Sequence, residues 1–249
     1  MLITSSDDAF AGRRPMKLRN GGDYMKSVFI GAIERPKEVD QTQPQAYVVA
    51  QAPGTVVEPH YHAVHQWQVV VDGEGKLGRY AVAPVSLHFT DPYTAYGPIV
   101  PGDKGVAYFS MRAMSDTGAH YLDVPGKKEA MRPSRRRFLL KTPSDLGLST
   151  PQALATRTAV TLDAIVEPWD DGVAGYVLRV GPGGTATAPD PSQCGGQYVV
   201  VVTGSIVHAG RAMPRLSTAF VYPADPAMAI QAGPEGAELL ILQYPRANA

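Results

Sequence analysis

The sequence predicts an all-β protein that consists of two tandem copies of one small barrel. Glycine (25 residues) and proline (22 residues) are too frequent for a helical bundle. The apolar segments between them are short, rich in valine and tyrosine, and bounded by turn residues, which is typical of strands. In addition, the chain resembles itself when it is shifted by one constant offset, which indicates a duplication.

The predicted strands occur in both halves of the chain. In the first half they cover 46–51, 65–72, 77–83, 85–90 and 106–112, and in the second half 175–180, 197–203, 205–209, 218–222 and 237–243. One short helix is expected over 150–155, because Thr150 can cap its first turn and Pro151 suits the first helical position.

An offset of 131 residues relates the two halves. It places the segment 66–73 (QWQVVVDG) on 197–204 (QYVVVVTG), and it aligns further phenylalanine, proline and glycine residues: Phe89 with Phe220, Pro92 with Pro223, Gly102 with Gly233 and Gly105 with Gly236. A register shared over about 40 residues indicates two copies of one β domain.

The segments outside the two copies complete the predicted organisation. We expect an N-terminal arm over 1–45, a first barrel over 46–119, a linker over 120–160 and a second barrel over 161–249. Within the arm, 24–30 can add an outer strand. The basic run 135–141 (RRRFLLK) is interpreted as a solvated part of the linker rather than as an anion or nucleic-acid contact, because the chain as a whole is neutral.

Charge and composition name no macromolecular partner. Lysine and arginine (23) balance aspartate and glutamate (23), so no global field favours nucleic acid or an anionic membrane. The N-terminus has no basic region followed by an apolar stretch, and no apolar run approaches the roughly 18 residues of a membrane-spanning helix. We therefore expect a soluble, cytoplasmic protein. Its single cysteine, Cys194, lies in a glycine-rich turn with no histidine near it in sequence, and we expect no catalytic role for it.

The candidate chemistry is concentrated in the first copy, where four of the six histidines fall within residues 60–88. Successive side chains of an extended segment alternate between faces, so His60 and His62 point the same way and can bring two imidazoles to one ion. Gln66 and Gln68 lie on the same face as His60 and His62 if the strand is unbroken. The spacing therefore indicates a polar or metal site on an inner wall of the first barrel.

These residues also carry a family resemblance. The spacing Gly54-x5-His60-x-His62-x3-Gln66-x6-Gly73 resembles the first motif of the cupin superfamily, G-x5-H-x-H-x3/4-E-x6-G, with Gln66 in the place of the glutamate. The second copy fits the same frame, but Asp190 and Ser192 replace both histidines and Gln197 stands at the glutamate position. The resemblance implies two jelly-roll barrels, that is, a bicupin.

The resemblance also implies a metal site of three histidines and a glutamate, from which this chain departs twice. The stretch 89–98 matches the second motif and places Tyr96, or less well Tyr93, where the third histidine is expected. The implied ligand set is His60, His62, Gln66 and Tyr96 for a divalent Fe, Mn, Ni, Cu or Zn ion. A neutral amide offsets no charge and a phenol binds well only after losing a proton, so a weaker site is expected unless His65 or His88 turns inward.

Each of these residues also has a structural interpretation. His60 and His62 can be neutral, hydrogen-bonded histidines in an empty barrel, Gln66 can clamp a substrate, and Tyr96 can close the barrel mouth. The opposite parity of His65 predicts a surface position, and His88 can face solvent because it alternates with apolar neighbours. In the second copy we expect the motif residues to fill a degenerate barrel: Asp190, Ser192 and Gln197.

Three functions are compatible with this pattern. The first is a metal-dependent dioxygenase or oxidoreductase acting on a small enolic or aromatic compound, with His60 and His62 as ligands and Gln66 and Tyr96 completing the catalytic set. The second is a metal-free isomerase or epimerase in which His62 and Tyr96 act as base and acid. The third is a binding module without turnover. The resemblance further implies a homodimer.

Overall fold

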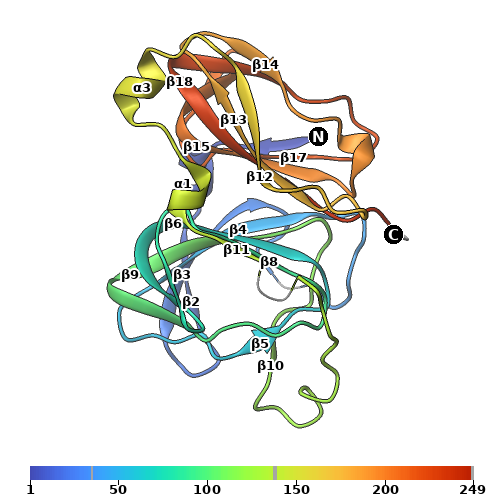
Figure 1. Cartoon of the computed structure of the whole chain (residues 1–249). Coiled ribbons are helices and arrows are strands. Elements are labelled where there is room, and N and C mark those ends of the chain that lie inside the picture. Colours follow the sequence, from blue (N-terminus) through green and yellow to red (C-terminus); the bar gives the residue numbers. More distant parts are fainter. Residues whose placement is uncertain (35, 137–138, 248–249) are drawn as a thin grey trace. The chain divides into compact units, whose positions relative to one another are not determined.

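The structure, a computed structural model, describes residues 1–34, 36–136 and 139–247. Two residues of the predicted basic run, Arg137 and Phe138, and the last two residues of the predicted second barrel lie outside the described residues. The chain forms two compact units, Gly12–Pro143 and Met1–Ala11 together with Ser144–Ala249 (Figure 1).

The N-terminal unit is an antiparallel β structure with the strand order β11-β8-β6-β9-β4-β3-β2. Strand β7 pairs with β6, and β5 pairs with β10 in a separate two-stranded sheet. The strands are β2 (Arg14–Lys17), β3 (Asp23–Ile30), β4 (Gln45–Gln51), β5 (His60–Tyr61), β6 (Gln66–Leu77), β7 (Tyr80–Val82), β8 (Leu87–Thr90), β9 (Ile99–Arg112), β10 (His120–Tyr121) and β11 (Leu140–Lys141).

The C-terminal unit has the strand order β1-β17-β15-β18-β13-β12, with β14 on β18 and β16 on β15. Its strands are β1 (Leu2–Thr4), β12 (Thr161–Val166), β13 (Ala174–Val180), β14 (Thr185–Thr187), β15 (Gln197–His208), β16 (Arg211–Met213), β17 (Thr218–Val221) and β18 (Ala229–Gln243). Both units therefore confirm the predicted all-β class.

Helices are few and short. They are α1 (Ser6–Ala11), α2 (Pro143–Leu146), α3 (Pro151–Ala155) and a 3-10 turn, η1 (Pro191–Gln193). The predicted cap of α3 is present, since Thr150 Oγ1 accepts a hydrogen bond from the amide of Ala153. Within the described part of the chain, no helix has the length and apolarity needed to cross a membrane.

The offset of 131 residues holds for the strands as well as for the sequence. It relates the start of β6 to that of β15, β7 to β16, β8 to β17, and the end of β9 to the end of β18. The glycine that closes the repeated segment has a physical role in both copies. Gly73 and Gly204 have positive φ (67° and 70°), and a Cβ there would overlap the carbonyl oxygen of Gly105 or Gly236 on the neighbouring strand.

The two units differ in what fills them. The C-terminal unit has a continuous apolar core, which includes Val199, Val201, Ala219, Leu239 and Ile241. In the N-terminal unit many buried side chains are polar or charged instead: Gln66, Gln68, His60, His62, His88, Ser110, Arg112 and Asp116. The interior of the second barrel is therefore filled by apolar side chains, whereas the first barrel encloses a polar site.

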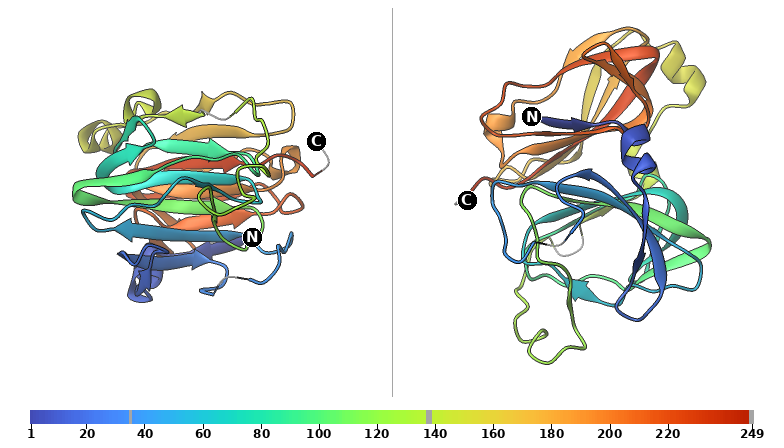
Figure 2. Two further views of the ribbon diagram at one scale, coloured as in Figure 1. Left: turned by 90° about the horizontal axis from the view of Figure 1, so that it is seen from below. Right: turned by 180° about the vertical axis from the view of Figure 1, so that it is seen from behind.

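The predicted arm and linker take part in the two folds. Residues 1–11 join the C-terminal unit, where β1 pairs with β17 in the register Leu2 to Phe220; the dark blue strand lies among orange strands in Figures 1 and 2. Strands β2 and β3 extend the large sheet of the N-terminal unit. From the predicted linker, β11 joins the same sheet beside β8, and β10 pairs with β5 in the separate two-stranded sheet. The N-terminal unit therefore includes residues before and after the predicted range 46–119. Strands from these flanking segments pair with strand edges that the predicted barrel alone would leave unpaired.

The interpretation of the basic run as wholly solvated is wrong for Arg136. Its side chain is buried, and its Nη2 and Nε donate to Oδ1 and Oδ2 of Asp91 at 2.6 and 3.2 Å. Ser134 Oγ also donates to Asp91, and His65 Nδ1 lies 3.2 Å from its Oδ1. Since the buried positive charge has a partly buried carboxylate partner, this part of the predicted linker is attached to the first barrel.

Candidate functional site

Strand pairing brings three of the four predicted residues, His60, His62 and Tyr96, to the lining of one pocket inside the N-terminal unit. Gln66 is fully buried outside that lining and contacts Tyr96. His60 forms a β-bridge with Tyr96, with backbone hydrogen bonds of 3.1 and 3.0 Å, so the side chains of two distant segments lie next to each other. Strand β6 supplies Gln66 and Gln68, and β9 beside it supplies Arg112. The pocket has a volume of about 90 Å³.

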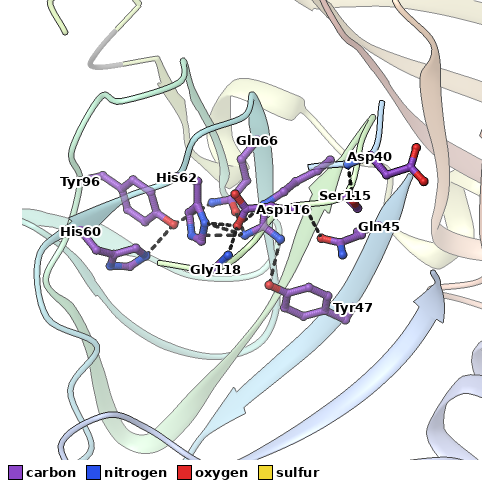
Figure 3. Close-up of polar contacts among 11 residues, drawn as sticks. Asp40, Gln45, Tyr47, His60, His62, Gln66, Tyr96, Ser115, Asp116 and Gly118 are labelled. Atoms are coloured by element: carbon purple, nitrogen blue, oxygen red, sulfur yellow. Dashed lines mark hydrogen bonds and ion pairs between the residues drawn. The ribbon is translucent and has the colours of Figure 1, made fainter. Parts of the chain in front are cut away.

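A chain of hydrogen bonds fixes the protons of His60 and Tyr96. Nδ1 of His60 lies 2.7 Å from the carbonyl oxygen of Glu58, which can only accept, so Nδ1 carries the proton. The lone pair of Nε2 then accepts from the Tyr96 hydroxyl at 2.9 Å, and Gln66 Nε2 donates to that hydroxyl at 2.7 Å (Figure 3). The phenol is therefore held from both sides in the buried interior.

His62 has a different partner. Its Nδ1 lies 2.6 Å from Oδ2 of Asp116, which also accepts from the amide of Gly118 at 2.9 Å (Figure 3). Because the carboxylate accepts, Nδ1 of His62 carries the proton and Nε2 has a lone pair. The pair is enclosed, since His62 is 6% and Asp116 is 3% exposed. The other carboxylate oxygen of Asp116, Oδ1, has no hydrogen-bond partner within the described residues, although Asp116 lines the pocket.

Arg112 places a positive charge at the centre of this network. Its Nη2 donates to Oε1 of Gln66, and its Nη1 donates to the Tyr47 hydroxyl at 2.9 Å. Nη2 also lies 3.2 Å from Nε2 and 3.3 Å from Nδ1 of His62. A position nearly equidistant from both ring nitrogens lies over the face of the imidazole, so Nη2 of Arg112 does not occupy the in-plane lone pair of Nε2.

Burial and the guanidinium determine the charge states of the pocket. Desolvation lowers the pKa of His60 to about 3, and desolvation together with Arg112 lowers the pKa of His62 to about 4, so both rings are neutral near pH 7. Burial raises the pKa of Tyr96 well above its usual value, which keeps the phenol protonated. Burial opposes the charge of Asp116, but the hydrogen bond from His62 and the charge of Arg112 hold its pKa well below the usual value.

The predicted metal ligands are already engaged in this network. A divalent ion at His60, His62, Gln66 and Tyr96 needs Oε1 of Gln66, which already accepts from Arg112, and a position beside His62, over whose ring the same guanidinium lies. A second cation there would be repelled at close range. Among the described residues, no group of three or more His, Cys, Asp or Glu side chains is arranged to hold a metal ion. The donor set does not fit a metal ion in this arrangement.

Other sequence candidates lie outside the pocket. His65 contacts Asp91, and Tyr93 packs against Tyr61 with ring centroids 5.5 Å apart, so Tyr96 is the tyrosine of the site. His88 turns inward: it is buried, its Nδ1 lies 3.0 Å from Oε1 of Gln68, and its ring lies 5.2 Å from that of Tyr96.

The expectation that the second motif fills a degenerate barrel is wrong for two of its three residues. Asp190 and Ser192 are exposed, and Asp190 Oδ1 caps the turn η1 by accepting from the amide of Ser192 at 2.9 Å. Only Gln197 is buried, where its Oε1 accepts from Gln243 at 2.9 Å. Cys194 is buried and burial raises the pKa of its thiol to about 11, which does not favour a nucleophile.

Sequence reasoning missed Asp116 and three polar residues of β9 that line the pocket, and for those three the internal repeat contained a signal that could have found them. Shifted by 131 residues, polar residues in and around the pocket fall on side chains that are mostly apolar: Gln68 on Val199, His88 on Ala219, Tyr108 on Leu239, Ser110 on Ile241 and Arg112 on Gln243. A core position that is polar in one copy and apolar in the other indicates a function of the polar copy. Asp116 lies beyond the repeated segment and carried no such signal.

Comparisons with known proteins place the fold. No family model matches the chain, and no curated protein is significantly similar to it. Among solved structures, it is similar to a putative dioxygenase from Nostoc punctiforme PCC 73102 (TM-score 0.65, 9% identity, 99% of this chain and 83% of that chain). It is also similar to the oxalate decarboxylase of Lactobacillus farciminis in complex with formate (TM-score 0.56, 14% identity, 98% and 86%) and to a variant of the Bacillus subtilis oxalate decarboxylase (TM-score 0.55, 13% identity, 100% and 78%).

These similarities cover both halves of the chain, and at 9% to 14% identity they establish its fold alone. The chain therefore has a fold of two tandem cupin-type β-barrels, as the motif over 54–73 predicted.

Proposed function

We propose that the N-terminal barrel binds a small anionic molecule and transfers a proton on it without a metal ion, as an isomerase or epimerase does. The observation that carries this proposal is the buried 2.6 Å contact between His62 and Asp116, in a pocket that also contains Tyr96 and Arg112. A base, an acid and a cation are what proton abstraction next to a carbonyl group requires.

His62 is the base in this proposal. Its ring is neutral near pH 7, and Asp116 both fixes the ring orientation and stabilises the imidazolium that forms. A carbon–hydrogen bond beside the carbonyl breaks, the proton goes to Nε2 of His62, and the electron pair stays on the substrate as an enolate. The enolate oxygen pairs with the guanidinium of Arg112.

Tyr96 is the acid. Its protonated hydroxyl is held by His60 and Gln66, and its ring lies nearly parallel to that of His62 (27°) with centroids 6.3 Å apart. Both residues line the same pocket, so a molecule bound there can meet Nε2 of His62 as the base and the Tyr96 hydroxyl as the acid. Tyr96 returns a proton to the carbon, His62 releases its proton to solvent, and the phenolate of Tyr96 takes up a proton from solvent, so the cycle balances. The unpaired Oδ1 of Asp116 favours a substrate that also has a hydroxyl group.

Hydrogen exchange tests this function. In D2O, the protein is expected to replace the C3 hydrogens of 2-oxobutyrate, seen as loss of their proton NMR signal, at least 100-fold faster than buffer. His62→Gln and Tyr96→Phe should each remove this activity, because each lacks one of the two proton-transfer groups, while His208→Gln in the C-terminal unit should retain it. Exchange that persists in His62→Gln contradicts the assignment of the base.

The metal-dependent dioxygenase or oxidoreductase implied by the cupin resemblance is the second candidate. The observation that favours it is the similarity of the fold to a putative dioxygenase. It requires Arg112 to leave Gln66 and His62. Elemental analysis of protein purified without a histidine tag separates the two functions: we expect less than about a tenth of an equivalent of Fe, Mn, Ni, Cu or Zn. One equivalent that is lost in His60→Ala/His62→Ala would favour the dioxygenase.

The cytoplasmic location and the homodimer stay predictions. Cell fractionation and light scattering of the purified protein test them.

A further inference from the structure

A second, larger cavity adjoins the pocket. It has a volume of about 610 Å³ and is lined by residues of the same unit, and it shares Leu18 and Tyr121 with the inner pocket. We refer to it as the outer groove. Because Leu18 and Tyr121 line both cavities, the pocket and the groove are neighbours separated by these two side chains.

Tyr121 forms the wall between the two cavities. It lies on β10, which pairs with β5 in the register Tyr121 to His60. The ring centroids of Tyr121 and His60 are 5.5 Å apart on the side of the pocket. On the side of the groove, the guanidinium of Arg19 lies 5.2 Å from the same ring and also forms an ion pair with Asp123. The aromatic face is therefore held between the reacting groups and the groove.

The groove suits a neutral, apolar group. Its charges cancel, because Arg19 is paired with Asp123 and the remaining lining charges, Glu58 and Lys128, have opposite signs. The remaining lining is largely apolar and consists of Leu18, Val56, Pro59, Tyr121 and Leu122, with Asn20. An anion gains little from such a surface, whereas an aromatic or alicyclic ring gains contact with Tyr121 and Leu122.

The volumes determine how a ligand divides between the cavities. The inner pocket, at about 90 Å³, has room for only a few heavy atoms, such as a carboxylate or an enol with its neighbouring carbons. The outer groove, at about 610 Å³, is in the size range of whole small-molecule sites. We infer that the ligand is an amphipathic acid whose polar head enters the inner pocket and whose neutral aromatic or alicyclic tail lies in the outer groove against Tyr121 and Leu122. This inference rests on the proposed function, which places the polar head at Arg112.

Calorimetric titration with two acids tests the inference. Acetate fits the inner pocket alone, whereas 3-phenylpropionate has a carboxylate and a ring separated by two carbons. We expect 3-phenylpropionate to bind at least 10-fold more tightly than acetate. Leu122→Ala should reduce that ratio to less than threefold without changing the affinity for acetate, because Leu122 lines only the groove. Lys128→Ala should weaken the binding of 3-phenylpropionate less than Arg112→Lys does, since the carboxylate does not bind in the groove. Lys104→Ala, at an exposed position of the same unit that lines neither cavity, is the control and should leave both affinities within twofold.

The outcomes separate this inference from the proposed function. Equal affinities for the two acids overturn the groove, while acetate binding that weakens at least 10-fold in Arg112→Lys still supports the inner site. Arg112→Lys retains the charge and is therefore used instead of a neutral variant. If 3-phenylpropionate binding weakens in Leu122→Ala or Lys128→Ala but not in Arg112→Lys, the carboxylate does not enter the pocket, and both the divided ligand and the proposed function are contradicted.

Discussion

Single residues determine the character of the pocket, and Arg112 has the largest effect. It ends β9 as a fully buried cation, and it contacts two of the residues that the cupin motif assigns to a metal. Asp116, four residues later, balances its charge; Nε of Arg112 lies 3.9 Å from Oδ2 of Asp116. A buried charge of this kind is retained only when it has partners, so the two residues are expected to depend on each other energetically.

Substitution of Arg112 tests this dependence. Arg112→Met should destabilise the N-terminal unit by about 3 to 5 kcal/mol, because Asp116 would remain charged and buried without its cation. The double variant Arg112→Met/Asp116→Asn should lose less unfolding free energy than the sum of the losses in the two single variants, because neither charge is then left buried without its partner. Urea unfolding followed by Trp67 fluorescence in a Trp169→Phe background measures both effects. Arg79→Met, which removes an exposed arginine of the same unit, should change stability by less than about 0.5 kcal/mol, and additive costs would contradict the coupling.

At the scale of elements, the segment 132–136 is fastened to the barrel through Asp91, next to the loop that carries Tyr96. Arg136, Ser134 and His65 all contact this carboxylate, and Arg136 also lies over the ring of Phe89 at 5.2 Å. Burial opposes the charge of Asp91, but hydrogen bonds from His65, Arg136 and Ser134 hold its pKa well below its usual value. The charged form is therefore the one that stabilises the fold.

Asp91→Asn should destabilise the N-terminal unit by about 2 to 3 kcal/mol at pH 7. Because the folded pKa lies below the unfolded value of about 3.9, the contribution of the carboxylate is complete above about pH 5 and is lost as the pH falls through the unfolded toward the folded pKa. The difference between wild type and Asp91→Asn should thus shrink between pH 5 and pH 2, as measured by urea unfolding across that range. Asp103→Asn, at an exposed position of β9, is the control, and a difference independent of pH would exclude this role of the carboxylate.

At the scale of the whole molecule, one of the two units is built from both ends of the chain. The first eleven residues belong to the C-terminal unit, where β1 covers the edge of β17 and Ile3 packs against the apolar core. The amide of Ser6 also donates to Ser217 Oγ at 3.2 Å. The N-terminal segment is therefore expected to stabilise the barrel that is farthest from it in sequence.

Ile3→Ala should cost the C-terminal unit about 2 kcal/mol, because it removes apolar atoms from the core, while Leu2→Ala, at a 41% exposed position, should cost less than about 0.5 kcal/mol. Trp169 fluorescence in a Trp67→Phe background reports the C-terminal unit, and Trp67 fluorescence in Trp169→Phe reports the other. Destabilisation of the N-terminal unit by Ile3→Ala would contradict the assignment of this strand.

The sequence by itself determined the β class, the duplication and the location of the chemistry. These features depend on local patterns: turn residues, strand alternation and the spacing of His60, His62 and Gln66 within seven residues. The sequence also predicted that Tyr96 lies at the site, because the second motif has a fixed position in the cupin fold that the resemblance implies.

Only the tertiary structure decided what those residues do. Arg112 and Asp116 are about fifty residues away from His62 in the chain, and they meet it because β9 pairs with β6 and the following segment folds back over the pocket. A pattern of single residues does not contain such long-range pairing, and a two-histidine motif has the same spacing whether a metal ion or a guanidinium lies beside it. The motif therefore predicted where the site is, and the buried charge of Arg112 decided its chemistry.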